Sequence, residues 1–512
     1  MTRFGSACPE GARAWTGRTL RIASVVVLVA VAWFGPSPRS PARALSVHLT
    51  APSSTRAIDA SRLRTGPRRD VRCPAGSIKL RPGRNLQVAI DANPEGTTFC
   101  FRSGTYRIKH VLLPKSRDVF VGEPGAVLKG SKRLSDWTRQ GGYWVATGQR
   151  QENEVVLGVP CQVGIECNRP EGLFIDRKPL LQVTSLSSVR RGRFFFDYLN
   201  DTIYMANDPR GHRVEASVGD GAFRSTHHYA PGVVIKNLVI ERFANPSRTG
   251  AIYTSISAGW VIVNNEIRLN HGAGISHFSG ARIRNNHIHH NGQVGLGGYK
   301  VVNAVVARNE IARNAIGGFA GWEAGGAKYV WTRGLQLRGN YVHHNRHHGL
   351  WTDTENRRTV FAGNRIVGNK GSGIFHEASY DAIMRNNVIA RNGADGIFIS
   401  SSSGVEAYGN TLAGNRGWGI HLFIDGARGY DLADNFIHEN VIKMRDETYN
   451  GISTVNTVDP TVYSISKNNR FRRNAYLVRR LSAPYWFWEE TLRTWKQWRA
   501  AGQDRNGTLR KR

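Results

Sequence analysis

Two carboxylates stand at equivalent positions of consecutive repeat units in the second half of the sequence. Asp353 follows Gly349 by four residues, and Glu377 follows Gly373 by four. If each unit contributes one strand, neighbouring strands lie about 4.8 Å apart, so both side chains share one outward face. A glycosidase uses such a pair as an acid together with a nucleophile or base.

The same two carboxylates could do other chemistry. They could hold Ca²⁺, which prefers carboxylate oxygens, and leave a lysine or arginine to remove a proton beside a uronate carboxylate. Without a cation between them, the two charges repel. The alternative is an ordinary solvated surface, on which Asp353 and Glu377 pair with arginines such as Arg357 and Arg358.

Four further side chains in these units are candidates. Side chains alternate across a strand, so Trp351 and Phe375 should be exposed on the same outward face and could offer apolar surfaces to sugar rings. His376 should point inward beside Glu377, either to orient that carboxylate or to satisfy a polar contact in the core. Tyr380 is a further candidate proton donor.

One repeat unit, residues 304–334, is longer than the others and carries GFAGWEAGGAKYVWTRG. Insertions in repeat proteins map to loops on one face, often the binding face. We expect Trp322, Glu323 and Lys328 in a loop beside the two carboxylates. Lys328 would serve as a base or a carboxylate clamp, and Trp322 would contact substrate. The alternative is a plain insertion, with Trp322 and Trp331 packed over the core.

Histidines gather in two groups at related positions. The first comprises His287, His289 and His290, and the second comprises His343, His344, His347 and His348. Their spacing lacks the companion carboxylates typical of a zinc site. The sequence therefore predicts solvated corner histidines and no metal ligands.

The repeat that positions these residues is marked by two columns of asparagine. The first column is Asn265, Asn286, Asn309, Asn340, Asn364, Asn387 and Asn410, and the second follows five residues later in every unit. The short β-branched pieces between Asn and Gly favour strands over helical hairpins. The repeat therefore predicts an all-β parallel β-helix, in which Asn side chains stack at equivalent corners and tolerate left-handed backbone.

A capping segment precedes the repeats. Residues 86–91 (LQVAID) have the pattern of a short amphipathic helix that would cover the open end of the solenoid. The sequence LQVAID…PEGTTF…SGTYRI…GEPGAVLKG, followed by N-x-I-x-x-N units, resembles the pectate-lyase-like superfamily of right-handed parallel β-helix proteins. The resemblance implies a right-handed solenoid of the kind found in secreted carbohydrate-active enzymes.

The chain divides into six predicted parts. They are a signal peptide (1–44), a flexible leader (45–71), the N-terminal cap and first coils (72–130), an inserted β module (131–221), the β-helix coils (222–440), and the last coils with a C-terminal segment (441–512). In that last segment Leu492, Trp495 and Trp498 have helical spacing. The module could shape one wall of a cleft, as the resemblance to β-helix glycoside hydrolases implies, or it could be structural packing.

The N-terminus and the cysteines both indicate export. Four arginines precede the apolar run 22–34, and residues 42–44 (ARA) offer a cleavage site; an uncleaved anchor is the alternative. Four cysteines remain after cleavage, which permits three pairings, and proximity favours Cys161 with Cys167 and Cys73 with Cys100. We expect a secreted or cell-envelope monomer, without stable membrane insertion once the signal is removed.

The net charge of +32 and pI near 10.6 favour anionic surroundings. No run of interleaved basic and aromatic residues indicates nucleic acid, so none is predicted as a partner. The sequence predicts an enzyme that cleaves a polysaccharide by hydrolysis or by uronate β-elimination, with Ca²⁺ as the one cofactor considered. The alternative is a non-catalytic envelope or extracellular β-helix that binds glycans.

Overall fold

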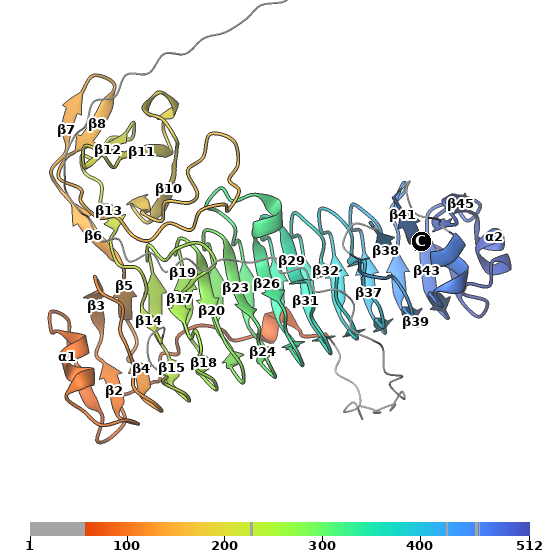
Figure 1. The fold of residues 1–512 in the computed structure, drawn as a ribbon, viewed down its shortest axis with the longest axis horizontal. Helices are drawn as coiled ribbons and strands as arrows, with labels where there is room; N and C mark the ends of the chain where they lie inside the picture. The colour runs from red at the N-terminus through yellow and green to blue at the C-terminus, as the bar shows by residue number, and fades with distance from the viewer. Residues whose placement is uncertain (1–56, 226–228, 426–428, 456–458, 460) are drawn as a thin grey trace, which may run out of the picture. The chain divides into compact units, whose positions relative to one another are not determined.

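The computed structural model describes residues 57–225, 229–425, 429–455, 459 and 461–512. The predicted signal peptide, residues 1–44, lies outside the described residues. Short strands repeat along the chain and stack into three long sheets, as Figure 1 shows. The regular coils each contribute one strand to each sheet, and neighbouring strands are parallel except for the last pair of one sheet, β44 (Trp486–Trp488) and β45 (Thr491–Arg493), which is antiparallel. The predicted parallel β-helix is confirmed.

Sheet A contains thirteen of the described strands. They are β1 (Ile78–Leu80), β2 (Thr98–Phe101), β4 (Val119–Gly122), β15 (Val234–Lys236), β18 (Val261–Val263), β21 (Arg282–Arg284), β24 (Val305–Ala307), β27 (Gln336–Arg338), β30 (Val360–Ala362), β33 (Ile383–Arg385), β36 (Glu406–Tyr408), β39 (Phe436–His438) and β42 (Arg470–Arg472).

Sheet B also contains thirteen of the described strands. They are β3 (Gly104–Arg107), β5 (Ala126–Lys129), β16 (Val239–Glu241), β19 (Glu266–Arg268), β22 (His287–His289), β25 (Glu310–Ala312), β28 (Tyr341–His343), β31 (Arg365–Val367), β34 (Val388–Ala390), β37 (Thr411–Ala413), β40 (Val441–Lys443), β43 (Ala475–Val478) and β46 (Thr508–Lys511).

Sheet C, which carries most of the candidate site residues, contains twelve of the described strands. They are β14 (Phe223–Arg224), β17 (Gly250–Tyr253), β20 (Ala273–Ser276), β23 (Val294–Tyr299), β26 (Gly325–Val330), β29 (His348–Asp353), β32 (Ile374–Glu377), β35 (Ile397–Ser400), β38 (Ile420–Ile424), β41 (Asn450–Thr454), β44 (Trp486–Trp488) and β45 (Thr491–Arg493).

The core is built from columns of residues that occupy equivalent positions on successive strands. Leu350, Ile374 and Ile397 are paired on successive strands of sheet C and are fully buried. The column two residues later, which includes Thr352 and His376, is buried as well. The sequence predicted that these two positions of each strand point inward, and the structure confirms this prediction.

The asparagine columns are buried hydrogen-bonded ladders. Asn364 Nδ2 donates to Asn387 Oδ1 of the next coil at 2.9 Å and to the Leu337 carbonyl at 2.8 Å. Asn364 Oδ1 in turn accepts from the backbone and side-chain N–H groups of Asn340. These amides satisfy corner backbone groups that water cannot reach, so their role is structural, as predicted.

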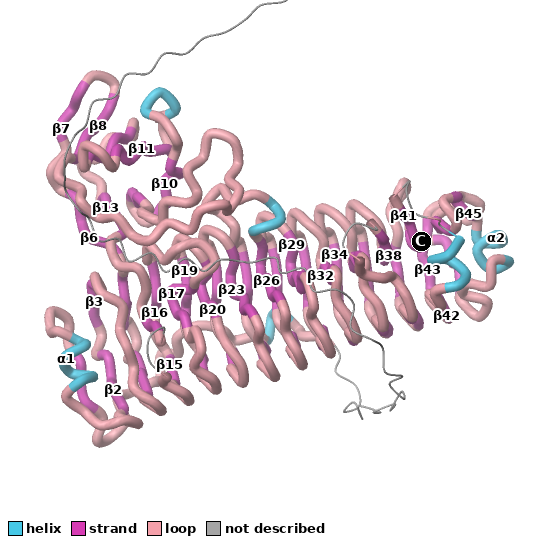
Figure 2. Tube along the Cα trace, viewed as in Figure 1, coloured by secondary structure: helices cyan, strands magenta, loops and turns pink. Residues whose placement is uncertain are grey.

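Both ends of the solenoid are capped, as Figure 2 shows by the helices at opposite ends of the strands. Helix α1 (Leu86–Asp91) forms where predicted and buries Leu86 and Ile90 against the first coils. Helix α2 (Trp495–Ala500) buries Trp498, whose indole donates to Asp504. The sequence pattern predicted that Leu492 also belongs to this helix. That prediction was wrong, because Leu492 lies in β45.

The inserted module is an eight-stranded sheet. Its strands are β6 (Ser131–Leu134), β7 (Thr138–Gln140), β8 (Tyr143–Ala146), β9 (Leu173–Ile175), β10 (Lys178–Gln182), β11 (Arg193–Asp197), β12 (Thr202–Met205) and β13 (Val214–Ser217), and its 3₁₀ turn η2 is Leu186–Ser188. The sheet is antiparallel except for the β10–β11 pair. Its own apolar core includes Trp144, Phe194 and Met205.

The described part of the predicted leader, residues 57–71, makes backbone hydrogen bonds to the coils. It includes the 3₁₀ turn η1 (Ala60–Arg62) and runs across several coils. Ile58 N–H donates to the Gly363 carbonyl and Gly66 N–H to the Asn285 carbonyl, both at 2.9 Å. Since these contacts span distant coils, we call residues 57–71 the strap.

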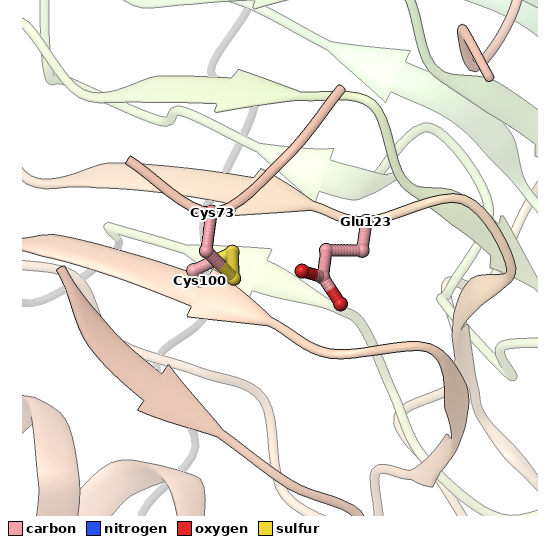
Figure 3. Close-up of side chains that lie close together, drawn as sticks. All are labelled: Cys73, Cys100 and Glu123. Carbon is pink, nitrogen blue, oxygen red and sulfur yellow. A yellow bond between two sulfur atoms is a disulfide. The ribbon is translucent and has the colours of Figure 1, made fainter. Parts of the chain in front are cut away.

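Both predicted disulfides are present, Cys73–Cys100 and Cys161–Cys167. Figure 3 shows the first of them with the Glu123 side chain beside it. The first disulfide joins Cys73, two residues after the strap, to β2, and the second closes a short loop of the module. Within the described residues, no helix has the length and apolar character needed to cross a membrane.

Candidate functional site

The two carboxylates singled out from the sequence are register partners. Asp353 at the end of β29 pairs with Glu377 at the end of β32, and both side chains are partly buried. The predicted adjacency is therefore confirmed. Their surroundings differ, however: Asp353 lines the cavity described below, and Glu377 does not.

Lys328 lies on strand β26, not in the loop where the sequence placed it. Its backbone pairs with Trp351 on β29, so its side chain shares the outward face of sheet C. The ammonium lies 3.2 Å from Asp353 Oδ2, donates to the Trp322 carbonyl at 2.8 Å, and sits 3.7 Å from the centre of the Trp351 ring. These three contacts hold the ammonium in place on the outward face, which suits a cation that binds a carboxylate.

Trp351 and Phe375 were expected to be exposed, and this was wrong. Trp351 is 3% exposed and Phe375 is 8% exposed. Their rings stack at 5.3 Å, and Phe375 stacks on Phe398 of the next strand at 4.7 Å. With Phe375 on one side and the Lys328 ammonium on the other, Trp351 has no open face for a sugar. Its indole N–H instead donates to Glu377 Oε2 at 3.2 Å.

His376 lies in the solenoid core, on the opposite side of the strand from the Glu377 carboxylate. It is fully buried, and its Nδ1 is 2.7 Å from Thr352 Oγ1. Burial lowers the pKa of His376 to about 3, so the ring is neutral. His376 therefore does not orient Glu377, and of the two roles considered only the core polar contact remains.

Tyr380 follows the corner at the end of β32. Its backbone bridges Arg357, and its ring lies 4.1 Å from the Arg357 guanidinium. Burial raises the pKa of Tyr380. The ring is thus held by Arg357 beyond the outward face of sheet C, and it does not line the cavity described below.

Glu323 ends the 3₁₀ turn η3 (Gly321–Glu323) in the long repeat unit and is buried. The Arg248 guanidinium binds it through Nη2 to Oε1 and through Nε to Oε2, the latter at 3.3 Å. Gln293 Nε2 donates to the same Oε2 at 3.3 Å. Arg248 and Gln293 were not predicted, because they come from earlier coils and carry no motif that links them to Glu323.

Glu323, Lys328 and Asp353 line one cavity of about 690 Å³ on the outer face of sheet C. The other polar and aromatic residues that line it are Arg248, Tyr253, Ser255, Ser276, His277, Phe278, Gln293, Tyr299 and Lys300. We call this cavity the sheet C groove. Its depth comes from small residues, since Ser276 and Gly297 occupy the outward column between Tyr253 and Lys328.

Exposed aromatic rings lie beside this groove. Trp322 is 59% exposed, Tyr299 58% and Trp331 48%, so Trp322 and Trp331 do not pack over the core. The Lys300 ammonium lies 5.2 Å from the Tyr299 ring and 5.5 Å from the Trp331 ring. These three rings are exposed, unlike Trp351 and Phe375, and only Trp322 was among the predicted site residues.

The long repeat unit also contacts the inserted module. Phe319 forms an antiparallel bridge with Cys161, and Gln162 N–H donates to the Gly318 carbonyl at 2.8 Å. The module thus abuts the loop that carries Glu323. A second cavity, of about 390 Å³, lies between the module and the coils, and its lining includes Glu171 and His271. Burial raises the pKa of Glu171 and lowers that of His271 to about 4.

Ca²⁺ does not fit the residues around Asp353 and Glu377. The ion takes roughly six to eight oxygen ligands, whereas Asp353 faces the Lys328 ammonium and Glu377 accepts from the Trp351 indole. Among the described residues, the groups with three close metal-ligand atoms do not include Asp353 or Glu377. One of those groups is Cys73, Cys100 and Glu123, in which the disulfide removes both thiolates (Figure 3).

Two of the three comparisons with known proteins gave matches. Residues 210–331, 249–412 and 324–442 match the family model of the right handed beta helix region. No curated protein matches the chain. Among solved structures, XylC in complex with xylose aligns at 16% identity over 83% of this chain and 82% of that chain, with a TM-score of 0.61.

Two epimerases align less closely. The A-module of the mannuronan C-5 epimerase AlgE6 of Azotobacter vinelandii is 14% identical over 83% of this chain and 93% of that one, with a TM-score of 0.44. The periplasmic alginate epimerase AlgG is 13% identical over 78% and 76%, with a TM-score of 0.34. The fold is supported by the family match, by the stacked parallel sheets and by the likeness to XylC. The chain is therefore a right-handed parallel β-helix protein.

Proposed function

We propose that this protein cleaves an acidic polysaccharide in the sheet C groove. The observation that carries the proposal is the Lys328–Asp353 pair on the wall of a groove that also holds Arg248 and Lys300. Cations at these positions suit the carboxylates of a uronate chain. The exposed Tyr299 beside them suits the apolar face of a sugar ring.

The pairing of both groove carboxyl groups with cations favours β-elimination over hydrolysis. A glycoside hydrolase needs one carboxylic acid that keeps its proton. Within the groove, Asp353 is paired with Lys328 and Glu323 with Arg248, so both carboxyl groups lie against cations. A carboxyl group held beside a cation suits a base that accepts the proton next to a uronate carboxylate.

In this proposal Lys328 and Arg248 position the uronate carboxylate and stabilise the charge that develops on it. Asp353 accepts the proton from C5 of the uronate. The C4–oxygen bond then breaks with its electron pair on the oxygen of the departing chain, which takes up a proton from water, and a C4=C5 double bond forms in the product. No step passes through Ca²⁺, and Glu377 has no direct role because its carboxylate accepts from Trp351 outside the groove.

The proposal places the activity outside the cytoplasm, in the secreted or envelope setting that the N-terminal sequence predicts. Two disulfides support this setting, because such bonds persist in oxidising compartments. The xylose bound to XylC supports a carbohydrate ligand for a solenoid of this fold. A monomeric state stays a prediction.

The test is incubation of the protein with uronate polymers and with neutral xylan. Reducing ends report any cleavage, and ultraviolet absorbance of unsaturated uronates reports β-elimination. We expect both signals with uronate polymers. Asp353→Asn should abolish them, whereas Glu377→Gln should keep most of the activity. Full activity of the Asp353→Asn variant would exclude the assigned site, and reducing ends without the absorbance would indicate hydrolysis.

A second candidate function is glycan binding without cleavage. The observation in its favour is that both carboxylates of the groove are already held by cations, as in a purely structural ion pair. Retention of the protein on an immobilised uronate polymer, with no product released, would support it. Loss of that retention in Lys328→Met would assign the binding to the same groove.

A further inference from the structure

A second cluster of chemistry-bearing side chains lies on sheet B, away from the sheet C groove. Strand β22 places His287 and His289 two residues apart, so both imidazoles point to the same outward face. Glu266 on β19 is the register partner of His287. The sequence treated these histidines as solvated corner residues without carboxylates, and that was wrong, because the carboxylate comes from the neighbouring strand.

The ligand atoms of these three residues converge. One atom from each of Glu266, His287 and His289 lies within 4.8 Å of the others. His289 Nε2 is 3.1 Å from Glu266 Oε1, and the two imidazole rings stack with their centres 3.9 Å apart. Two imidazole nitrogens with one carboxylate oxygen form a ligand set that Zn²⁺ uses in proteins. We propose that Glu266, His287 and His289 bind a divalent transition metal ion, with Zn²⁺ as the preferred ion.

The next strand extends the site. Glu310 on β25 is the register partner of His287 on its other side, and its Oε1 lies 3.8 Å from His287 Nε2. Glu310 is also held by His343 Nε2 at 3.1 Å and by the Thr65 hydroxyl at 3.1 Å. It therefore offers either a fourth ligand or a hydrogen-bond acceptor that orients His287, and metal-binding histidines need such a partner.

Arg268 competes with a metal for Glu266, since its Nη1 contacts Glu266 Oε1. Arg268 also has a second carboxylate partner, because its Nε donates to Glu241 Oε2 at 2.8 Å. Binding of an ion at Glu266 would thus leave the guanidinium paired with Glu241. The arrangement avoids an unpaired cation, which would otherwise oppose metal binding.

The strap covers one side of this cluster. Gly66 donates to the Asn285 carbonyl, and a Cβ placed at Gly66 would lie 3.7 Å from the His287 Cβ. Thr65 binds Glu310, the neighbour of the site. An ion bound here would link strands β19 and β22 beneath the strap. Its effect would be to stabilise the fold, with no part in the chemistry of the sheet C groove.

The experiment uses the full chain after removal of metal with EDTA. Zn²⁺ is added with a competing chromophoric chelator, and thermal unfolding is followed in parallel. We expect one Zn²⁺ per chain from this site and a higher Tm with Zn²⁺. The double variant H287Q/H289Q should weaken binding at least tenfold and lose the Tm increase, because glutamine keeps the polar volume but lacks the imidazole nitrogens.

The matched control is His421→Gln. His421 also stacks on an aromatic ring and pairs with a carboxylate, Asp395 at 3.2 Å, but on sheet C and without a second histidine. We expect its Zn²⁺ affinity to equal that of the unaltered chain. Co²⁺ added to the unaltered protein gives an independent readout, since a site with nitrogen ligands produces visible absorption bands. Unchanged Zn²⁺ binding in H287Q/H289Q, or no Zn²⁺ and Co²⁺ binding by the folded unaltered chain, would overturn the proposal.

Discussion

The ammonium of Lys328 lies 3.2 Å from the carboxylate of Asp353, and the two residues occupy adjacent strands of sheet C. This contact gives the groove wall a fixed pair of opposite charges. Lys328 is also held against the Trp351 ring, so the ammonium has little freedom to leave. A uronate carboxylate that enters the groove meets a cation already in position, which lowers the entropic cost of binding.

Replacement of Lys328 by methionine tests this preorganised cation. We expect kcat/KM on an acidic polysaccharide to fall about tenfold to a hundredfold, the worth of one charge-assisted contact. Lys328→Arg should restore part of the activity. The matched control is Lys370→Met at an exposed corner position, which should leave activity unchanged. Equal activity of Lys328→Met and the unaltered protein would contradict the assignment.

The asparagine ladder gives a prediction about stability. Asn364→Ala removes donors to the Leu337 carbonyl and to Asn387, and it leaves the Asn340 amide without its acceptor. Each buried polar group left unpaired costs about 1–3 kcal/mol, so we expect a loss of about 3 kcal/mol or more in the free energy of unfolding. Urea unfolding measures the loss, with the exposed Thr411→Ala as control. A loss equal to that of the control would show that the ladder does not stabilise the coils.

Buried histidines predict sensitivity to acid. Burial lowers the pKa of His376 to about 3, and those of His271 and His277 to about 4, from an unfolded value near 6.5. At a pH between the folded and unfolded pKa values, the unfolded chain therefore binds more protons than the folded chain. Stability should be complete above about pH 6.5 and should fall as the pH falls toward about 3.

Replacement of His376 by leucine isolates one part of this effect. The change removes a buried ring whose Nε2 has no hydrogen-bond partner, and it removes one titrating group. We expect the slope of stability against pH between about 6.5 and 3 to be shallower in His376→Leu than in the unaltered chain. The exposed His110→Leu should leave the slope unchanged. The check is urea unfolding at a series of pH values; identical slopes for all three proteins would contradict the prediction.

The two disulfides should differ in their contribution to stability. Cys73 and Cys100 are 27 residues apart, whereas Cys161 and Cys167 are separated by six. On the chain-entropy model, loss of the first bond costs about 3.5 kcal/mol and loss of the second about 2 kcal/mol. Unfolding of the Cys73→Ser/Cys100→Ser and Cys161→Ser/Cys167→Ser variants measures the difference. The reverse order would show that native contacts, and not loop closure, dominate.

The repeat pattern was sufficient to predict the architecture. Asparagine and glycine recur at corner positions, and the residues between them alternate between core and surface, so the repeat predicts the register of each strand. That register correctly paired Asp353 with Glu377 and correctly buried Leu350 and Ile374. Cysteine spacing likewise gave both disulfides. These features depend on neighbours at a fixed distance along the chain, which a periodic sequence specifies.

The tertiary structure alone decided which outward residues form a site. Stacking on Phe375 and contact with Lys328 bury Trp351, although the alternation places it outside. Arg248 reaches Glu323, and Glu266 meets His289, from strands or loops of other coils. The repeat determines in which coil and on which face of the sheet each residue lies. The size of the neighbouring side chains determines whether that residue is buried, partly covered or lines a cavity.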